Sequence, residues 1–449
     1  MRTSLLIGSS LCLVAGVWSC DALWSSSVVD CGRSGFKCPE GYTPPGQDLS
    51  MNDSDGGTGS EDGGGSPGSD GSVTGDMANP SGPAYTSIYI LGDNTRRTYL
   101  GTADGNIQQY VDIGGVPSKS GGLMPYDSGS AIVGIWRGDV VTQLSGITHS
   151  ALLVASNNKK IFLYVNGVNL TTEKLDTEYP INSMWVGAWN AVTTSLSTMQ
   201  SITILTAGDS SELRTGQLVD NGMLGNSKLK IDWTVIANLP GQPNLRSVTG
   251  LARIDRYDAM VRCSTTRDPM CDNGAAWAVG QMGQIHYYRS PGVSQIFSWA
   301  PIAGVSGMIT ASDLDAVGVS PMTGRITAMG QQNTMLERQT HSASWMNADP
   351  SPIMASIRAI TYCDENEAYA VGDSAKVYRW LSSDMQWKPL SITIAGKPFS
   401  GSDFKAVHCL PPGTSTMGRI GIVGTNRTYV FANIQADGNR TLSPWQLVL

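Results

Sequence analysis

Ala368–Trp380 reads AYAVGDSAKVYRW, and its pattern recurs along the chain. Aligned on Gly372, six further stretches have a small or apolar residue two positions earlier and an apolar residue five positions later. Turn-forming residues lie between, so each stretch is predicted to be a β-hairpin. The aligned positions are Thr102, Ser156, Gly208, Gly280, Gly330, Gly372 and Gly424, and the apolar partners are Ile107, Ile161, Leu213, Ile285, Met335, Val377 and Tyr429.

Short apolar strands flank these hairpins. IRAITY at Ile357 and FKAVHC at Phe404 come before a hairpin, and Trp387 opens a strand after one. One strand before, two within and one after make a four-stranded antiparallel sheet, and a repeat every 42 to 72 residues is typical of propeller blades. We predict an all-β fold, a seven-bladed β-propeller over residues 84–449. The last blade has four strands of its own, so closure depends on packing of blades one and seven.

Two of the units carry a family resemblance. AWAVGQMGQI and AYAVGDSAKVYRW, each with a following Trp, resemble the repeats of BNR-like and photosystem II assembly-factor-like propellers of exported bacterial proteins. The resemblance covers residues 84–449 and is best in blades four, six and seven. It implies the fold and no particular activity, because propellers host many functions.

The N-terminus predicts export. Met1–Cys20 has one Arg, an apolar core and then small residues, as a secretory signal peptide does. Val17–Cys20 resembles a bacterial lipobox, which makes residues 1–19 the signal peptide and Cys20 the lipidated first residue. The expected location is the cell envelope, as a membrane-anchored lipoprotein. Ordinary cleavage around Ser19–Ala22, giving a soluble secreted or periplasmic protein, is the alternative.

Cysteine number agrees with export. Six cysteines remain if Cys12 leaves with the signal and Cys20 carries lipid, and an even number suits a disulfide framework. The spacing of four of these cysteines predicts two local disulfides. One closes a small loop, and the other lies across the loop 254–274. The last two end the first strands of blades six and seven, so we predict a disulfide between these blades. In that order the pairs are Cys31–Cys38, Cys263–Cys271 and Cys363–Cys409.

A linker separates the N-terminal segment, residues 20–45, from the propeller. Residues 46–83 are rich in Gly, Ser and Asp and cannot bury enough apolar surface to fold, so a disordered stalk is expected. The acids match no calcium-loop spacing. Net charge is −7 with a pI near 5.1, so nothing suggests a nucleic-acid footprint, and no nucleic-acid partner is expected.

The sequence carries no recognisable catalytic motif. The nearest approach to a sialidase Asp box, Ser382–Trp387, lacks the Gly and the spacing. The four His are isolated, and neither a Gly-x-Ser-x-Gly elbow nor a phosphate loop occurs. We expect no catalytic residue, metal or cofactor. A sialidase-like, carbohydrate-active hydrolase with a site at the central opening stays the alternative, which clustered carboxylates with Arg or Tyr there would favour.

Binding remains the expected activity. The hairpin turns of a propeller emerge on one face around the central opening, and recognition residues usually lie on such loops. Here the turns are polar and mixed in charge, which suits a protein or glycan partner at the cell surface or in the periplasm, although these residues are also ordinary turn formers. A eukaryotic secreted protein, with glycosylation acceptors at Asn169, Asn426 and Asn439, is a third reading. The predicted binding face is Asp104, Asn158, Lys159, Asp209, Glu212, Gln281, Gln332, Asp373, Lys376 and Arg427.

Overall fold

A computed structural model describes most of a compact unit, Thr74–Leu449. The described residues are 82–92, 95–123, 129–141, 148–166, 168–174, 179–193, 197–220, 229–237, 242–251, 275–289, 300–301, 307–308, 310, 312–321, 323–338, 345–348, 353–413, 417–437 and 440–448. The predicted signal peptide, the segment 20–45, most of the linker, the loop 254–274 and Cys20, Cys31, Cys38, Cys263 and Cys271 lie outside them. In the described part, no helix has the length and apolarity that a membrane crossing needs.

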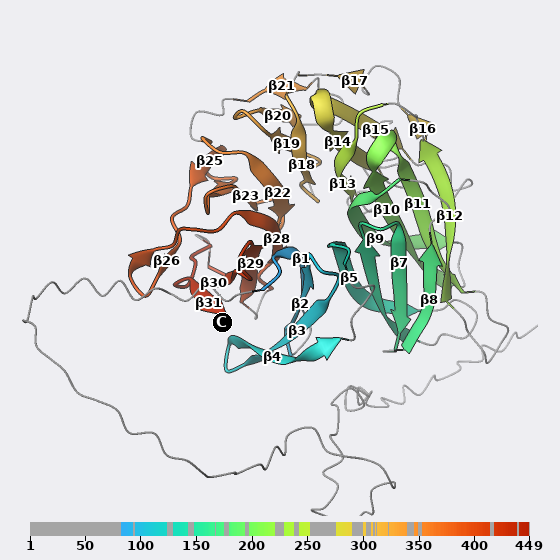
Figure 1. Ribbon diagram of the computed structural model, residues 1–449, viewed down its shortest axis with the longest axis horizontal. Coiled ribbons are helices and arrows are strands. Elements are labelled where there is room, and N and C mark those ends of the chain that lie inside the picture. The colour runs from blue at the N-terminus through green and yellow to red at the C-terminus, as the bar shows by residue number, and fades with distance from the viewer. Residues whose placement is uncertain are drawn as a thin grey trace, which may run out of the picture. The chain divides into compact units, whose positions relative to one another are not determined.

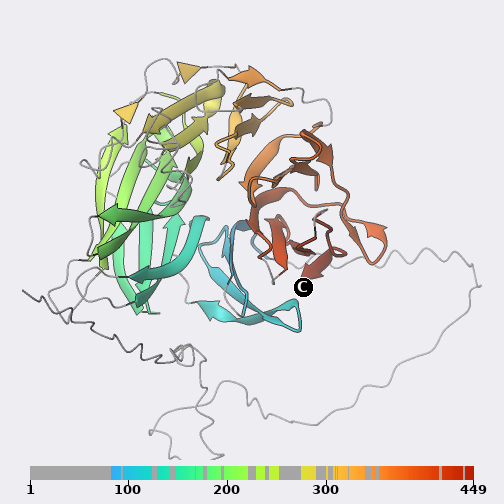
Figure 2. The ribbon, with the colours of Figure 1, turned by 180° about the vertical axis from the view of Figure 1, so that it is seen from behind.

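Seven antiparallel sheets follow one another around a ring (Figure 1; Figure 2 gives the view from behind). Blade one holds β1 (Tyr85–Leu91), β2 (Arg97–Thr102), β3 (Ile107–Ile113) and β4 (Val116–Leu123); blade two holds β5 (Ile132–Val141), β6 (Thr148–Ser156), β7 (Lys160–Val165) and β8 (Val168–Lys174). Blade three holds β9 (Ile181–Thr193), β10 (Ser197–Gly208), β11 (Leu213–Asp220) and β12 (Leu229–Ala237). The predicted fold class is confirmed.

The remaining four blades differ mainly in their outer strands, some of which are only two residues long. Blade four holds β13 (Leu245–Leu251), β14 (Ala275–Gly280), β15 (Gln284–Arg289) and β16 (Ala300–Pro301), with β17 (Gly307–Met308) as an addition; blade five holds β18 (Leu314–Val319), β19 (Ile326–Gly330), β20 (Met335–Arg338) and β21 (Met346–Asn347). Blade six holds β22 (Ile357–Tyr362), β23 (Glu367–Gly372), β24 (Val377–Leu381) and β25 (Gln386–Pro389), followed by the hairpin β26–β27 (Thr393–Ile394, Lys397–Pro398); blade seven holds β28 (Phe404–Leu410), β29 (Gly418–Gly424), β30 (Tyr429–Ile434) and β31 (Gln446–Val448).

The same backbone hydrogen bond closes every blade. The N–H one residue after the aligned position donates to the carbonyl just before the innermost strand, at 2.9–3.1 Å. In the five blades where the aligned residue is Gly, a Cβ would lie 1.9–2.4 Å from that carbonyl oxygen, so only Gly fits. The bonds run Ala103 to Ala84, Asn157 to Ala131, Asp209 to Pro180, Gln281 to Asn244, Gln331 to Asp313, Asp373 to Ser356, and Thr425 to Asp403.

Apolar packing between blades completes the ring. The described residues form seven buried clusters, and each cluster joins two neighbouring blades. The cluster between the last and first blades includes Phe431 and Tyr429 packed with Ile88 and Ile90. Face-to-face packing of sheets thus buries the branched and aromatic residues of the repeat.

The first and last blades meet without sharing a strand, as predicted, because β28 to β31 form a complete sheet. Polar bonds reinforce this seam. The Arg419 side chain is fully buried and donates to Asp112 and to the Gly115 carbonyl, the latter at 3.0 Å. Tyr429 lies 3.3 Å from the Thr98 hydroxyl.

The predicted disulfide between blades six and seven is present. Cys363 follows β22 and Cys409 lies in β28, and their Cα atoms are 5.0 Å apart. Both side chains are buried in the apolar cluster between the two blades. A covalent bond therefore ties the innermost strands of the last two blades, next to the seam.

Gly372→Ala tests the closing bond. The added Cβ would lie 2.0 Å from the Ser356 carbonyl oxygen, so the turn must move and weaken the bond from Asp373. We expect a loss of about 2 kcal/mol or more in unfolding free energy, measured by urea denaturation. Gly396→Ala is the control, because its Cβ meets nothing within 4 Å at φ +78° and should cost about 1 kcal/mol. Equal losses in the two variants would contradict the explanation.

Candidate functional site

Every innermost strand carries a one-residue β-bulge at its start. In blade six, Ile357 pairs with Gly372 and Ala359 with Val371, which leaves Arg358 as the extra residue. The same register shift occurs in the other six blades. Bulges re-aim a side chain, and all seven extra residues line one central cavity. This mouth ring consists of Thr86, Val133, Asn182, Arg246, Asp315, Arg358 and Lys405.

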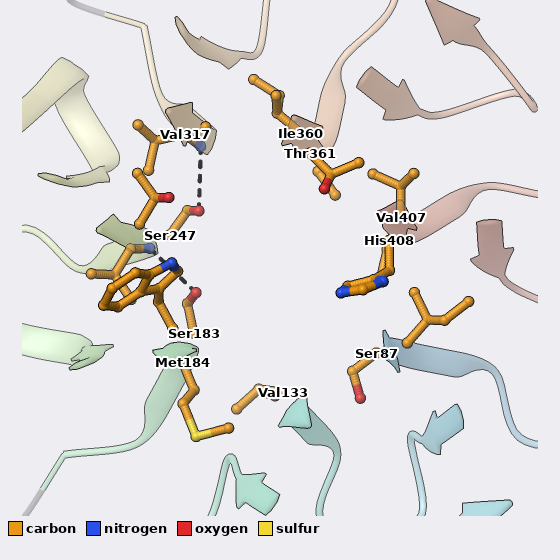
Figure 3. A pocket seen from close by; sticks show the side chains of 18 of the residues that line it. Ser87, Val133, Ser183, Met184, Ser247, Val317, Ile360, Thr361, Val407 and His408 are labelled. Atoms are coloured by element: carbon orange, nitrogen blue, oxygen red, sulfur yellow. Dashed lines mark hydrogen bonds between the residues drawn. The ribbon is translucent and has the colours of Figure 1, made fainter. Parts of the chain in front are cut away.

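The cavity has a volume of about 650 Å³ and is lined by the innermost strands of all seven blades. Two residues beyond the mouth ring, each strand contributes an apolar side chain. Figure 3 shows four of them around the opening: Met184, Val317, Ile360 and Val407. The complete apolar ring is Ile88, Ile135, Met184, Val248, Val317, Ile360 and Val407.

One residue further on, the wall becomes asymmetric. Blades seven, one, two and three contribute ring side chains, which we call the aromatic arc: His408, Tyr89, Trp136 and Trp185. Blades four to six contribute only Thr249, Gly318 and Thr361 at this depth. The Trp185 ring reaches across to blade four: a Cβ at Gly250 would be 2.7–2.8 Å from three atoms of the indole, so glycine makes room for it there.

Ion pairs bind the mouth ring together across blades four, five and six. Arg246 bonds Asp313 and Asp315, and Arg358 bonds Asp315 and Asp373, at 2.5–2.9 Å. The Asp315 side chain is only 5% exposed and accepts from both arginines. The bidentate bond from Arg358 lowers the pKa of Asp373, and in return Asp373 raises the pKa of Arg358. The Asp373 carboxylate is therefore the ionised partner of Arg358.

Polar bonds continue the network on both sides. The Asn182 amide donates to Asp209 at 2.7 Å and to the Leu245 carbonyl at 2.8 Å, linking blades three and four. On the other side, Lys405 lies 3.9 Å from Asp403. Every charged member of the mouth ring thus has an oppositely charged neighbour.

His408 belongs both to the aromatic arc and to the seam between blades seven and one. Its Nδ1 accepts a hydrogen bond from the Ile90 N–H at 3.3 Å, which assigns the ring proton of the neutral form to Nε2. The imidazole lies against the Tyr89 ring, with centroids 4.7 Å apart. Burial lowers the pKa of His408 to about 4, so the ring is neutral at pH 7.

The predicted binding-face residues are described, and they divide into groups. Asp209 and Asp373 join the network of the mouth ring. Gln332 and Lys376 are exposed on their turns, while Glu212 is buried and paired with Arg214. The others (Asp104, Asn158, Lys159, Gln281 and Arg427) are partly buried in the turns.

The repeat pattern of the sequence did not predict the mouth ring or the aromatic arc. A usable signal exists, since each mouth-ring residue directly follows the apolar residue that starts the innermost strand, as in Leu245-Arg246 and Phe404-Lys405. A search for alternating apolar and polar residues does not detect this signal, because a bulge reverses the side-chain direction after one residue.

Fold and site together define a seven-bladed β-propeller with a charged mouth and a partly aromatic axial cavity. Among the described residues, no group of three or more His, Cys, Asp or Glu could hold a metal ion. No protein-family model matches the chain, and no curated protein is significantly similar to it in sequence.

The folded protein should become less stable as the pH is lowered, because His408 is buried in its neutral form. Its pKa is about 4 in the folded protein and near 6.5 unfolded, so the unfolded chain binds the proton first as pH falls. The stabilisation is complete above about pH 6.5 and is lost toward pH 4, on the order of 3 kcal/mol. Urea midpoints from pH 7 to pH 4 should therefore fall more for the wild type than for His408→Gln. Parallel curves for the two proteins would contradict this role.

Proposed function

We propose that the protein is a non-catalytic binding or scaffold module of the cell envelope. Its partner is a protein or glycan, recognised by the face that carries the mouth ring and the hairpin turns. The observation that carries the proposal is that each charged mouth-ring side chain lies 2.5–3.9 Å from a side chain of opposite charge. General acid–base catalysis needs a group that can exchange a proton near neutral pH, whereas fixed pairs present stable donors and acceptors.

Variation around the ring supports recognition. The seven mouth-ring positions are equivalent in backbone geometry, yet they hold Thr, Val, Asn, Arg, Asp and Lys. A position that served packing alone would favour one residue type in all blades. Different side chains on a rigid repeating scaffold are typical of binding surfaces.

A carbohydrate-active hydrolase is the second candidate. Three carboxylates and two arginines gather at the mouth, and such a cluster favours an enzyme. However, Arg246 and Arg358 already bond two carboxylates each, so a sialic-acid carboxylate would have to displace a partner. The lowered pKa of Asp373 also makes it a poor general acid at neutral pH.

The envelope location rests on the N-terminal sequence. A signal peptide at residues 1–19, lipid on Cys20 and the stalk at residues 46–83 would hold the propeller away from a membrane by a flexible tether. The lipid is the proposed contact with the membrane. The resemblance to BNR-like and photosystem II assembly-factor-like propellers of exported bacterial proteins supports the same assignment.

Intact mass of the mature protein tests the anchor. We expect an N-terminus at Cys20 that carries acyl chains, and a gain of six hydrogens on reduction, which corresponds to the three predicted disulfides. Cys20→Ser should abolish acylation and move the protein from the membrane fraction to the soluble fraction. An unmodified N-terminus near Ala22 would contradict the anchor.

Site-specific photo-crosslinking tests the binding face. Lys376 is exposed on a turn of blade six, and Lys388 is exposed on the outer strand of the same blade, so the two positions form a matched pair. With a crosslinker at each position in producing cells, we expect a defined adduct from 376 and none from 388. Equal labelling would argue against a specific face.

A glycoside hydrolysis assay distinguishes a binding module from a hydrolase. We expect the wild type to turn over a panel of fluorogenic glycosides, a sialoside included, no faster than Asp373→Asn and Asp315→Asn. Turnover that falls about 100-fold or more in these variants would establish the hydrolase instead.

A further inference from the structure

We infer that the axial cavity is a binding site for an uncharged oligosaccharide, which enters past the mouth ring and packs a sugar ring on the aromatic arc. This specifies the ligand of the proposed binding module and rests on that function. Three properties of the cavity lead to it: its compensated charge, the shape and chemistry of its wall, and its blocked strand edges.

Charge compensation at the mouth selects against a charged ligand. Arg358 donates through Nε and one terminal nitrogen to Asp373 and through the other to Asp315, and Arg246 divides its donors between Asp315 and Asp313. An ionic ligand entering here would lose water without meeting an unpaired countercharge. A hydroxyl group both donates and accepts, so it can add to such pairs without breaking them.

The aromatic arc supplies the aromatic part of the cavity wall on one half of the cavity. Trp136, Trp185 and Tyr89 each pack on one side against an apolar cluster between two blades, and each stays partly exposed and lines the cavity. Across from them, Thr249 and Thr361 offer hydroxyl-bearing side chains. A pyranose ring has an apolar C–H face and a hydroxylated edge, and the negative face of an aromatic ring attracts such C–H groups. The two halves of the wall fit the two sides of a sugar.

The dimensions fit more than one sugar ring. The arc lies three residues beyond the mouth ring along each strand, which is about 10 Å. A volume of about 650 Å³ falls within the roughly 300–1,000 Å³ typical of small-molecule sites. A short oligosaccharide that reaches from the mouth to the arc would therefore use both sets of side chains.

Blocked strand edges argue against an extended peptide. A peptide that adds to a sheet needs free backbone N–H groups along the edge strand. Here the Val248 N–H donates to Ser183 Oγ and the Val317 N–H to Ser247 Oγ, both at 3.2–3.3 Å, which Figure 3 shows as dashed lines. The Ile90 N–H is likewise bound to His408. Side chains of neighbouring blades thus occupy edge donors in three of the innermost strands.

Calorimetry with the full mature chain tests the site. The probes are maltotriose, cellotriose and chitotriose as neutral sugars, with lactose and 3′-sialyllactose as an uncharged–anionic pair. We expect binding of at least one neutral trisaccharide, and no preference for 3′-sialyllactose over lactose. Trp185→Ala should weaken the binding by about tenfold or more, since a buried aromatic contact is lost.

Two further variants distinguish a loss of binding from a loss of folding. Thr361→Phe adds bulk from the wall across from the arc and should block binding while it leaves the arc intact. Trp445→Phe alters a Trp buried outside the cavity lining and should leave the affinity unchanged. Thermal unfolding of each variant confirms that it is folded. If Trp445→Phe weakens binding as much as Trp185→Ala, the assignment to the cavity is wrong.

The outcomes separate the ligand class from the function. If no neutral trisaccharide binds, but a random peptide library yields binders that Thr361→Phe or a change at Lys376 abolishes, the oligosaccharide inference fails and the binding module stands. If 3′-sialyllactose binds more tightly than every neutral probe, the inference that the ligand is uncharged is wrong. If neither sugars nor peptides bind and position 376 gives no crosslinked adduct, both are overturned.

Discussion

One backbone hydrogen bond, from the hairpin turn to the carbonyl before the innermost strand, sets the geometry of every blade. It holds the turn so close to that carbonyl that a Cβ on the aligned residue of five blades would collide with it. Because the turn is fixed there and normal pairing resumes two residues later, one residue in between has no partner on the second strand. That residue is turned toward the axis, so the repeat that closes the blade also builds the mouth ring.

Closure of the ring depends on a different set of bonds. A propeller whose last blade borrows no strand from the first has to seal the seam with side chains, since no ladder of backbone bonds crosses it. Here the seam contains an apolar cluster, the buried Arg419–Asp112 pair and the His408–Ile90 bond. A fully buried Arg is costly to desolvate, and its bonds to Asp112, Gly115 and Asn433 offset that cost only in one geometry. The seam is therefore specific as well as stable.

Sequence patterns predicted what the repeat itself encodes. Seven aligned hairpins gave the number of blades, and two cysteines at equivalent strand ends gave Cys363–Cys409. The mouth ring escaped prediction because a bulge changes register by one residue, so the alternation of side chains along the strand does not show which residue faces the axis. The aromatic arc escaped it for another reason: Trp136 and Trp185 alternate along their strands like any core aromatic and do pack against the clusters between blades, and only their place on the innermost strands also brings them to the cavity wall.

Breaking of the sevenfold symmetry gives the cavity its chemistry. Charged mouth-ring residues fall on blades four to seven, whereas the ring side chains of the deeper arc fall on blades seven to three. An arginine directly above an indole wall would lose hydration on one side, and the strength of its ion pairs would then depend on what fills the cavity. With the two features on largely opposite halves, the ion pairs stay partly exposed and the apolar wall stays accessible. A ligand that satisfies both must present hydrogen-bonding groups to one side and an apolar face to the other, and this requirement, more than the fold, defines what the protein can recognise.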